Sequence, residues 1–316
     1  MGENAVTQKA LAQNKEIKRS LVLIVIAIVL GVLLGFAGSH HGWTLGGSSA
    51  LPGFALAVIA AFVVQWLAYI PAAIAQTDRY FDATGALTYI SVTILLLVLS
   101  PGLDPRSIIL GALVIVWAAR LGSFLFMRNR RSGRDDRFDE IKTSKIRFLG
   151  VWTVQGLWVS LTAAAAWISI TSSERAPLDW TTWVGLAIWV VGFGIEVTAD
   201  LQKNRFKADP GNKGKFIQSG LWSVSRHPNY FGEILLWVGV LVIALPALQG
   251  WQWIALLSPV FVIVLLTRVS GIPLLEEKAQ RKWGDDPEYQ AYRASTSVLV
   301  PLPKSRRGSP SPSNTN

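Results

Sequence analysis

The sequence contains no cysteine, three histidines and few charged residues, and each shortage excludes a class of chemistry. Without cysteine there can be no disulfide, no thiolate nucleophile and no cysteine-ligated metal centre. His40 and His41 are predicted to lie in a loop on the opposite side of a membrane from His227, so we expect no catalytic metal. Charged residues make up 16% of the chain, against roughly 25% in soluble domains.

Two nucleotide-binding devices are also missing. No Gly-x-Gly-x-x-Gly follows a predicted strand, and no Walker loop is present. Neither a Rossmann turn nor a phosphate-binding loop can therefore hold a nucleotide in this chain. Any such cofactor would be held by helix ends and connecting loops.

Apolar residues dominate what is present, at 51% of the chain, with a mean hydropathy of +0.38. Apolar stretches of about 18 to 21 residues recur, long enough to cross a hydrocarbon core of roughly 30 Å. We expect membrane spans at 21–38, 51–74, 85–100, 107–127, 149–171, 180–200, 231–248 and 251–268. The predicted fold is an all-α, polytopic bundle of about eight transmembrane helices, within a range of about seven to nine.

Lysine and arginine are distributed unevenly among the predicted loops, and the formal net charge is +10. The connections after the odd-numbered spans contain only Arg106 and Arg175. The termini and the other connections contain nearly all the rest, at 9–19, 128–147, 203–226 and 278–307. The positive-inside rule then predicts that both termini are cytoplasmic. The charge is explained by topology and anionic lipid headgroups, so no nucleic-acid partner is expected.

The expected organisation is simple. A cytoplasmic segment 1–20 precedes one membrane-embedded domain over 21–302, and a Ser/Pro/Asn-rich tail over 303–316 is predicted to be disordered. We find no internal repeat and no inverted pair of broken helices, the features that would favour a transporter. We expect a multi-pass protein of the bacterial cytoplasmic membrane, or of the endoplasmic reticulum if the source is eukaryotic.

Polar residues concentrate between positions 196 and 292, at the predicted cytoplasmic ends of the last spans. Glu196 and Asp200 are four residues apart and share a helix face, which Asn204 and Lys207 continue if the helix extends. Carboxylates near hydrocarbon usually face a polar cavity. The alternative is that they only form ion pairs with Lys203 and its basic neighbours.

The run from Ser225 to Glu233 places Arg226, His227, Asn229 and Tyr230 where the seventh span begins. Pro228 suits the first turn of a helix. The free N–H groups of a helix N-terminus suit a phosphate, and an arginine adds a bidentate donor. In the fourth span, Arg120 lies within an apolar run and is a further candidate. Trp222 fits an interfacial position.

Three stretches resemble the bacterial branch of the steroid 5α-reductase superfamily, often labelled DUF1295. They are 196–233 with its Ser225–Glu233 run, 270–276 with Tyr289 and Tyr292, and 120–138 with its Arg120-Leu121-Gly122 start. The resemblance implies a membrane-embedded, NADPH-dependent oxidoreductase that reduces a C=C bond in a sterol, steroid or related lipid. The expected partners are this lipid-like substrate and membrane lipids, and the oligomeric state is open.

The resemblance also implies site residues. Asp200, Lys207, Asn229 and Glu233 match cofactor contacts, and Asn204 stands where an arginine is usual. The full set predicted to bind the cofactor is Glu196, Asp200, Lys203, Asn204, Lys207, Trp222, Arg226, His227, Asn229, Tyr230, Glu233, Glu276, Tyr289 and Tyr292. The Gln-Glu pair of steroid-active members is not found, and Trp117 falls near the position of their tyrosine. Tyr80, Asp82, Tyr89 and Arg120 are the catalytic candidates.

Two rival interpretations stay open. The Arg-His-Pro-x-Tyr pattern followed by Glu276-Glu277 also occurs in integral-membrane methyltransferases of isoprenoids and phospholipids, which use S-adenosylmethionine. The many cations near the site favour the phosphates of NADPH over that cofactor. A lipid-binding or scaffold protein without activity is the third possibility, because a fold can outlive its chemistry.

Overall fold

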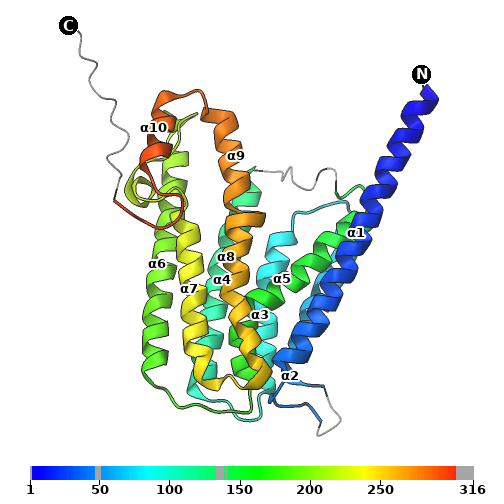
Figure 1. Cartoon of the computed structure of the whole chain (residues 1–316), viewed down its shortest axis with the longest axis vertical. Coiled ribbons are helices and arrows are strands. Elements are labelled where there is room, and N and C mark those ends of the chain that lie inside the picture. Colours follow the sequence, from blue (N-terminus) through cyan, green and yellow to red (C-terminus); the bar gives the residue numbers. More distant parts are fainter. Residues whose placement is uncertain (1, 47–50, 133–138, 140, 304–316) are drawn as a thin grey trace. The chain divides into compact units, whose positions relative to one another are not determined.

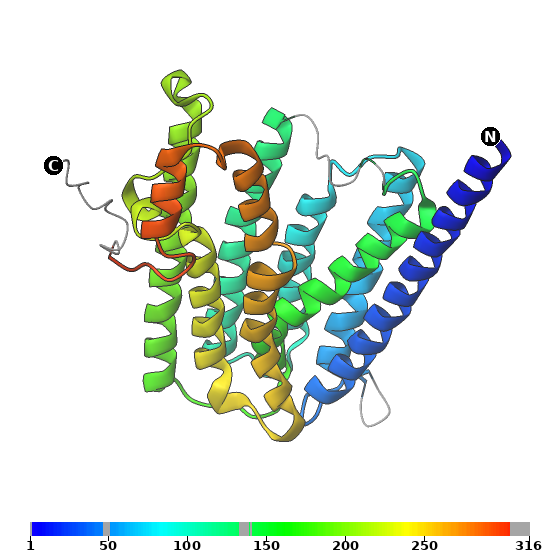
Figure 2. The same cartoon turned by 45° about the horizontal axis from the view of Figure 1, so that its top comes forward.

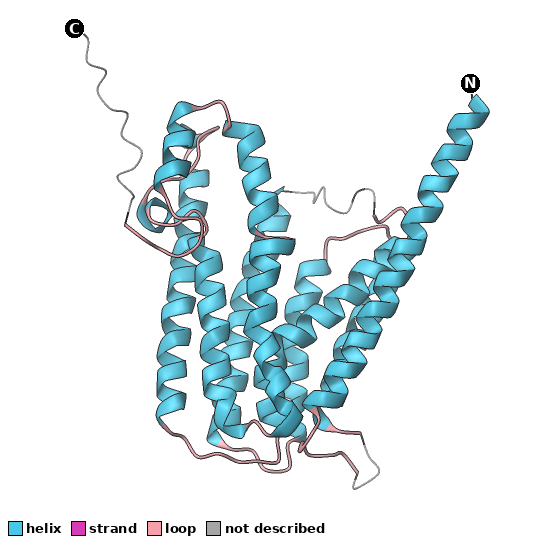
Figure 3. Ribbon diagram, viewed as in Figure 1, coloured by secondary structure: helices cyan, strands magenta, loops and turns pink. Residues whose placement is uncertain are grey.

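The computed structural model describes residues 2–46, 51–132, 139 and 141–303. Helices and loops account for all of the described chain, which contains no strand (Figure 3). Eight of these helical segments are long and apolar enough to cross a membrane. The predicted all-α, multi-pass membrane fold is confirmed. The predicted tail and the segment Gly133 to Phe138 lie outside the described residues, apart from Pro303.

The chain forms two compact units, and the first contains 1–182 and 243–258. Its α-helices, labelled in Figure 1, are α1 (Gly2–Gly38), α2 (Gly53–Ile74), α3 (Phe81–Leu99), α4 (Pro105–Ser132), α5 (Lys145–Thr171) and the start of α6. It also contains the 3₁₀ turns η4 (Leu245–Ala247) and η5 (Gly250–Leu256). Helix α1 packs against α2 and α5, and it runs alongside α5 in Figure 2. Most of its remaining surface is apolar and exposed, as expected for a helix that faces lipid.

Hydrogen bonds join the connections after the odd-numbered spans at one end of this unit. Trp43 donates its N–H to the Thr171 carbonyl at 2.9 Å, and Ser173 donates to the His41 carbonyl at 2.8 Å. The Ser172 hydroxyl donates to the Ala247 carbonyl at 2.9 Å. These contacts bring together the connections that the alternating topology places on one side. Which side is cytoplasmic stays a prediction.

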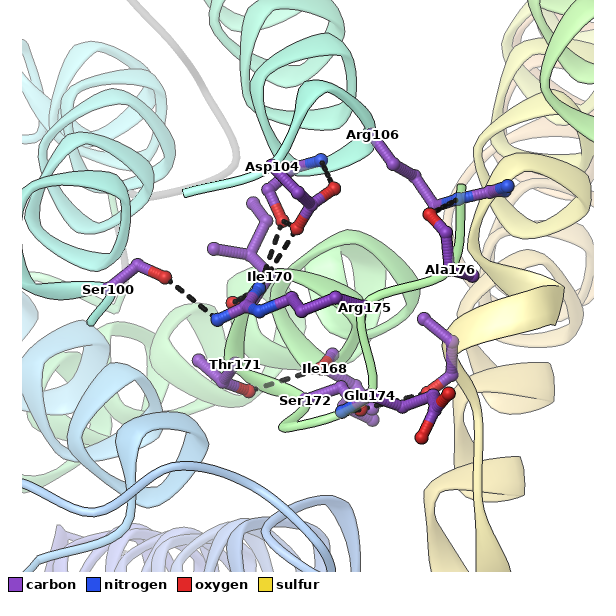
Figure 4. A network of polar contacts seen from close by, with 12 residues as sticks. Ser100, Asp104, Arg106, Ile168, Ile170, Thr171, Ser172, Glu174, Arg175 and Ala176 are labelled. Atoms are coloured by element: carbon purple, nitrogen blue, oxygen red, sulfur yellow. Dashed lines mark hydrogen bonds and ion pairs between the residues drawn. The ribbon is translucent and has the colours of Figure 1, made fainter. Parts of the chain in front are cut away.

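Two arginines lie at the same end (Figure 4). Arg175 donates to the Asp104 carboxylate at 3.0 Å and to the Ser100 hydroxyl at 3.0 Å. Arg106 is only 1% exposed and pairs with Asp179 at 3.1 Å. Hydrogen bonds from the Thr181 hydroxyl and the Arg106 guanidinium lower the pKa of Asp179 to about 2. Both arginines at this end are therefore paired with neighbouring carboxylates.

The second unit contains 183–242 and the chain from 259 onward. Its helices are α6 (Trp180–Ala208), α7 (Pro228–Ala244), α8 (Leu257–Val264), α9 (Ile272–Trp283) and α10 (Pro287–Ser295), with the 3₁₀ turns η2 (Pro210–Asn212) and η3 (Gly220–Ser223) and a π-helical turn (Leu265–Val269). The first residues of α6 and α8 and the last two of α7 belong to the first unit. Asp286 caps α10 by accepting the Glu288 N–H, with Pro287 in the first turn.

Glycine brings α6 and α7 into backbone contact. A Cβ on Gly232 would lie 2.5 Å from the Gly192 carbonyl oxygen and 2.6 Å from the Glu196 nitrogen. A Cβ on Gly239 would lie 2.6 Å from the Gly185 carbonyl oxygen. Small residues are the usual means by which helices approach closely in lipid. Here the contact fixes the start of α7 beside the Glu196 turn of α6.

Several predicted boundaries differ from the structure. Helix α6 continues past residue 200 to Ala208, because its polar last turns extend the helix beyond its apolar part. Helix α7 begins at Pro228, as the preference of proline for the first turn of a helix predicts. The last predicted span is not one α-helix: it combines a 3₁₀ turn, an α-helix and a π-helical turn and ends at Ser270 and Gly271. Apolar periodicity does not report these changes of hydrogen-bond register.

Candidate cofactor site

The Ser225–Glu233 run is held in place by the segment that follows α10. The Arg226 N–H donates to the Ser297 carbonyl at 2.8 Å. The Ser225 hydroxyl donates to the Leu299 carbonyl at 2.7 Å and accepts the His227 N–H at 3.1 Å. Residues 297–302 thus lie along the approach to α7 and fix the backbone from which the Arg226 and His227 side chains project.

Glu276 on α9 joins these two side chains. One carboxylate oxygen pairs with the Arg226 guanidinium, and the other lies 2.8 Å from the Nε2 atom of His227. Arg293 on α10 lies 3.7 Å from the same carboxylate. Since Glu276 accepts from both motif residues, it positions them relative to each other. Sequence separation of about fifty residues concealed this pairing.

Two nitrogens of this cluster are buried without a hydrogen-bond partner among the described residues: the Nε of Arg226 and the Nδ1 of His227. An unsatisfied buried polar group costs about 1–3 kcal/mol. Such groups in a native protein call for an explanation, and a bound ligand is one. If Nε2 of His227 donates to Glu276, Nδ1 is an acceptor for a hydroxyl or amide. The Nε of Arg226 is a donor for an anion.

The electrostatics of His227 follow from its burial. Burial lowers its pKa below the usual 6.5, despite the opposing effect of the Glu276 carboxylate. The imidazole is therefore neutral at pH 7. Its ring stacks on Tyr230, with the centroids 5.7 Å apart and the planes at 10°. The ring orientation is thus set by Glu276 on one edge and Tyr230 on one face.

The predicted polar face of α6 continues to the end of the helix. Glu196 is 2% exposed and Asp200 is 7% exposed, whereas Asn204 and Lys207 are exposed. The face therefore passes from buried carboxylates to an exposed cation. On α7, Asn229 and Glu233 are half-buried and four residues apart, so they share a face on the first turns. The Gly232 contact places Glu196 against this same part of α7.

Trp222, Tyr289 and Tyr292 also make structural contacts. The Trp222 indole donates to the Ala199 carbonyl at 3.0 Å, and the Nζ of Lys203 lies 4.3 Å from its ring centroid. The Tyr292 hydroxyl donates to the Trp222 carbonyl at 2.7 Å, and burial raises its pKa. Tyr289 packs against Phe216. A cofactor role for these aromatic residues stays a prediction.

The four catalytic candidates belong to the first unit. Tyr80 is exposed before α3, and Asp82 is half-buried in its first turn. Tyr89 is buried, with its ring edge to face against Trp117 at 5.1 Å. Arg120 on α4 is half-buried and lies over the Phe124 ring. The side chains thus differ widely in burial, and Tyr89 is the most enclosed of the four.

Sequence reasoning missed a buried polar pair in the same unit. Gln65 on α2 is fully buried and donates its side-chain amide to the Thr88 hydroxyl at 2.8 Å. Thr88 precedes Tyr89 on α3 and donates in turn to the Thr84 carbonyl at 2.7 Å. A glutamine inside an apolar run was the available signal, because polar side chains in lipid usually have partners or a function.

The fold and the polar cluster of Arg226, His227 and Glu276 define a polytopic membrane protein with a polar site at helix ends. The family described as "Protein of unknown function (DUF1295)" matches residues 68–296, and the chain belongs to this family. The predicted steroid 5α-reductase superfamily is confirmed, while the bacterial branch stays a prediction.

Three curated relatives are similar to parts of the chain. A steroid 5-alpha-reductase DET2 of Gossypium hirsutum is 29% identical over 141 residues, 44% of this chain and 50% of the relative. A 3-oxo-5-alpha-steroid 4-dehydrogenase 1 of Rattus norvegicus is 30% identical over 131 residues, 39% of this chain and 44% of the relative. A probable O-methyltransferase ustE of Ustilaginoidea virens is 44% identical over 46 residues, 15% of this chain and 16% of the relative.

The chain matches half or less of the length of each of these relatives. No solved structure matches the chain.

Proposed function

We propose that the protein is an NADPH-dependent reductase of a C=C bond in a sterol, steroid or related lipid dissolved in the bilayer. Membership of the family and similarity to two steroid-metabolising relatives support this reaction class. The eight apolar spans support a substrate that reaches the protein through the membrane. The expected membrane is the cytoplasmic membrane of a bacterium.

The observation that carries the proposal is the incomplete hydrogen bonding of the Arg226 and His227 pair. Both side chains are fixed by Glu276, and each retains one buried nitrogen without a partner among the described residues. The nucleotide offers phosphate oxygens to the donor of Arg226 and a ribose hydroxyl to the acceptor of His227. The residues present therefore fit this cofactor.

The other residues of the second unit have distinct roles in the proposal. Glu233 and Asn229 present an acceptor and an amide from the first turns of α7, and Lys207 adds a cation from the end of α6. When bound, NADPH supplies a hydride to one carbon of the double bond. The protein orients the reactants and excludes water from the site.

A proton must reach the second carbon, or the oxygen conjugated with it, when the double bond is reduced. We assign this proton transfer to the first unit, with Tyr89 as the leading candidate and Tyr80, Asp82 and Arg120 as the others. Tyr89 is preferred because its ring is buried and oriented by Trp117. Tyr89→Phe should lower the rate of reduction and leave the Kd for NADPH unchanged.

The cofactor assignment is tested by nucleotide binding to Asn229→Ala and Glu233→Ala, measured by titration calorimetry on the detergent-solubilised protein. Each variant should weaken NADPH binding by about tenfold or more, the cost of one charge-assisted hydrogen bond. Glu277→Ala is the matched control, because Glu277 is an exposed carboxylate that pairs with Arg281. Unchanged affinity in both test variants would reject this location of the site.

A methyltransferase is the second candidate. The similarity to the probable O-methyltransferase favours it, because 46 residues match at a higher identity than the reductases reach. S-adenosylmethionine also has a ribose and a carboxylate that an arginine can bind. It lacks phosphates, so binding of NADPH in preference to S-adenosylmethionine separates the two functions.

A further inference from the structure

An apolar groove of about 710 Å³ lies between α1 and α2 in the first unit, with Trp251 of η5 at one end. Its volume falls within the range of about 300–1,000 Å³ that is typical of small-molecule sites. Apart from Trp251, its lining residues come from 28–66 and precede the segment that matches the family. The groove is thus a feature of this chain in addition to the shared family segment.

Glycine and alanine give the groove its depth. A Cβ on Gly35 of α1 would lie 3.7 Å from the Cα of Ala55 on α2. At Gly31 a Cβ would lie 2.8 Å from the Phe62 ring, so that ring covers the glycine. Larger and more exposed side chains form the two edges, with Val32 65% exposed and Ile59 48% exposed. The walls are therefore helix surfaces, and because both helices are long and apolar enough to cross a membrane, we expect the opening between them to be accessible to lipid.

Hydrogen-bonding groups occur at one end of the groove. His40 and Trp251 are exposed there. The Ser39 hydroxyl accepts the Ala55 N–H at 3.1 Å and retains its own proton to donate. Farther along, the Trp66 indole donates to the Thr153 hydroxyl at 3.1 Å and is already satisfied. This distribution suits a ligand with one polar group at the end of an apolar body.

Charge decides between classes of lipid. None of the residues that line the groove is charged. At this end, the cations of the described loops and helix ends are Arg106, which pairs with Asp179, and Arg175, which pairs with Asp104 (Figure 4). A phospholipid phosphate would therefore find no available cation beside the groove. A neutral lipid needs no cation to pair with, and a rigid neutral lipid loses less conformational entropy when it binds than a flexible one.

We propose that this groove binds a neutral, polycyclic lipid whose single hydroxyl or carbonyl group lies beside His40, Ser39 and Trp251. The proposal rests on the lining of the groove and on the paired loop cations. It does not depend on the reductase activity, and a bilayer phospholipid or a free fatty acid is the competing occupant.

The test is photolabelling of the full-length protein in lipid nanodiscs without nucleotide. A diazirine analogue of cholesterol is compared with a diazirine phosphatidylglycerol, and labelled peptides are identified by mass spectrometry. We expect the sterol probe to label peptides from 28–40 and 52–66, and excess unlabelled cholesterol to suppress that labelling. Equal labelling by the phospholipid probe would overturn the choice of a neutral ligand.

Two matched variants locate the binding. Val32→Trp places an indole at the edge of the groove and should reduce sterol labelling by about tenfold. Leu33→Trp is the control, because Leu33 is also exposed on α1 but does not line the groove. Ile59→Trp replaces Val32→Trp if the latter unfolds at a lower temperature. Undiminished labelling in the folded groove variant would overturn the site, whereas NADPH binding should be the same in all variants.

Discussion

Two arginines of the described chain, the buried Arg106 and the half-buried Arg226, lie in very different surroundings. Arg106 in the first unit directs its donors at the carbonyls of Ala176, Pro177 and Ile243, at the Thr181 hydroxyl and at the Asp179 carboxylate. In the second unit, Arg226 is paired with Glu276 but retains a buried Nε without a partner among the described residues. The first has the hydrogen bonding of a structural group, and the second that of a binding group.

The difference teaches how to interpret cations near a membrane. A charge buried in apolar surroundings is costly unless it is paired and fully hydrogen-bonded. Full hydrogen bonding at Arg106 ties together the loops around α4, α5 and α7 and leaves nothing for a ligand. Incomplete hydrogen bonding at Arg226 and His227 leaves directed groups that a ligand can complete. Each prediction below changes one member of this comparison.

The largest effect is expected from Arg106→Leu. This change leaves five acceptors without their donor, among them the buried Ile243 carbonyl and Thr181 hydroxyl, so the free energy of unfolding should fall by about 3–5 kcal/mol. Thermal or chemical unfolding in detergent measures it. Arg175→Leu is the control with a more exposed side chain, and it should cost less. A neutral result for Arg106→Leu would contradict a structural role.

Arg226→Gln should act mainly on ligand binding. Removing the charge should weaken NADPH binding by about 100-fold, which corresponds to about 2.7 kcal/mol. The loss of unfolding free energy should be smaller than in Arg106→Leu. Titration of nucleotide into the variant provides the affinity. Arg293→Gln, which changes a more exposed partner of the same carboxylate, should bind nearly as well as the unchanged protein.

Gly232→Ala tests the close contact that brings Glu196 beside α7. Its Cβ would collide with the α6 backbone, so the free energy of unfolding should fall by about 1–3 kcal/mol. Gly194→Ala is the matched control, because a Cβ there would meet nothing within 4 Å. If both alanine variants unfold at the same denaturant concentration, the helices do not pack as described.

The pH dependence should be the smallest effect. His227 has a pKa below 6.5 in the folded protein because it is buried. The stability contributed by the neutral His227 imidazole is fully present above pH 6.5. It is lost as the pH falls from 6.5 toward the pKa of the folded state, because in this range the unfolded chain binds a proton and the folded protein does not. The slope is at most about 1.4 kcal/mol per pH unit. Chemical unfolding of His227→Gln across this range should show a shallower slope, and an unchanged slope would contradict the assignment.

The sequence was sufficient for the membrane fold and for the local position of the motif. Apolar length predicted the eight spans, and Pro228 predicted the start of α7, because both signals act within one helix. The polar face from Glu196 to Lys207 was predicted for the same reason. Residues three or four positions apart in a helix lie on the same face, so this arrangement can be predicted from the sequence.

Contacts between distant segments were not predictable in the same way. The pairing of Glu276 with Arg226 and His227, and the segment 297–302 beside Ser225, depend on how α9 and α10 pack. The same limit applies to the Gln65 and Thr88 pair and to the five acceptors of Arg106. A single sequence contains no local signal for the partner that a polar side chain will meet across the fold.

The measurement that tests the central claim most directly is thermal unfolding of the purified protein and of Arg226→Gln with NADPH, NADH or S-adenosylmethionine. A ligand at about 100 times its Kd stabilises the folded state by about 2.7 kcal/mol. We predict that NADPH raises the unfolding temperature of the unchanged protein and not that of the variant. Selective stabilisation by S-adenosylmethionine, or an equal effect of NADPH on both proteins, would contradict the proposed cofactor site.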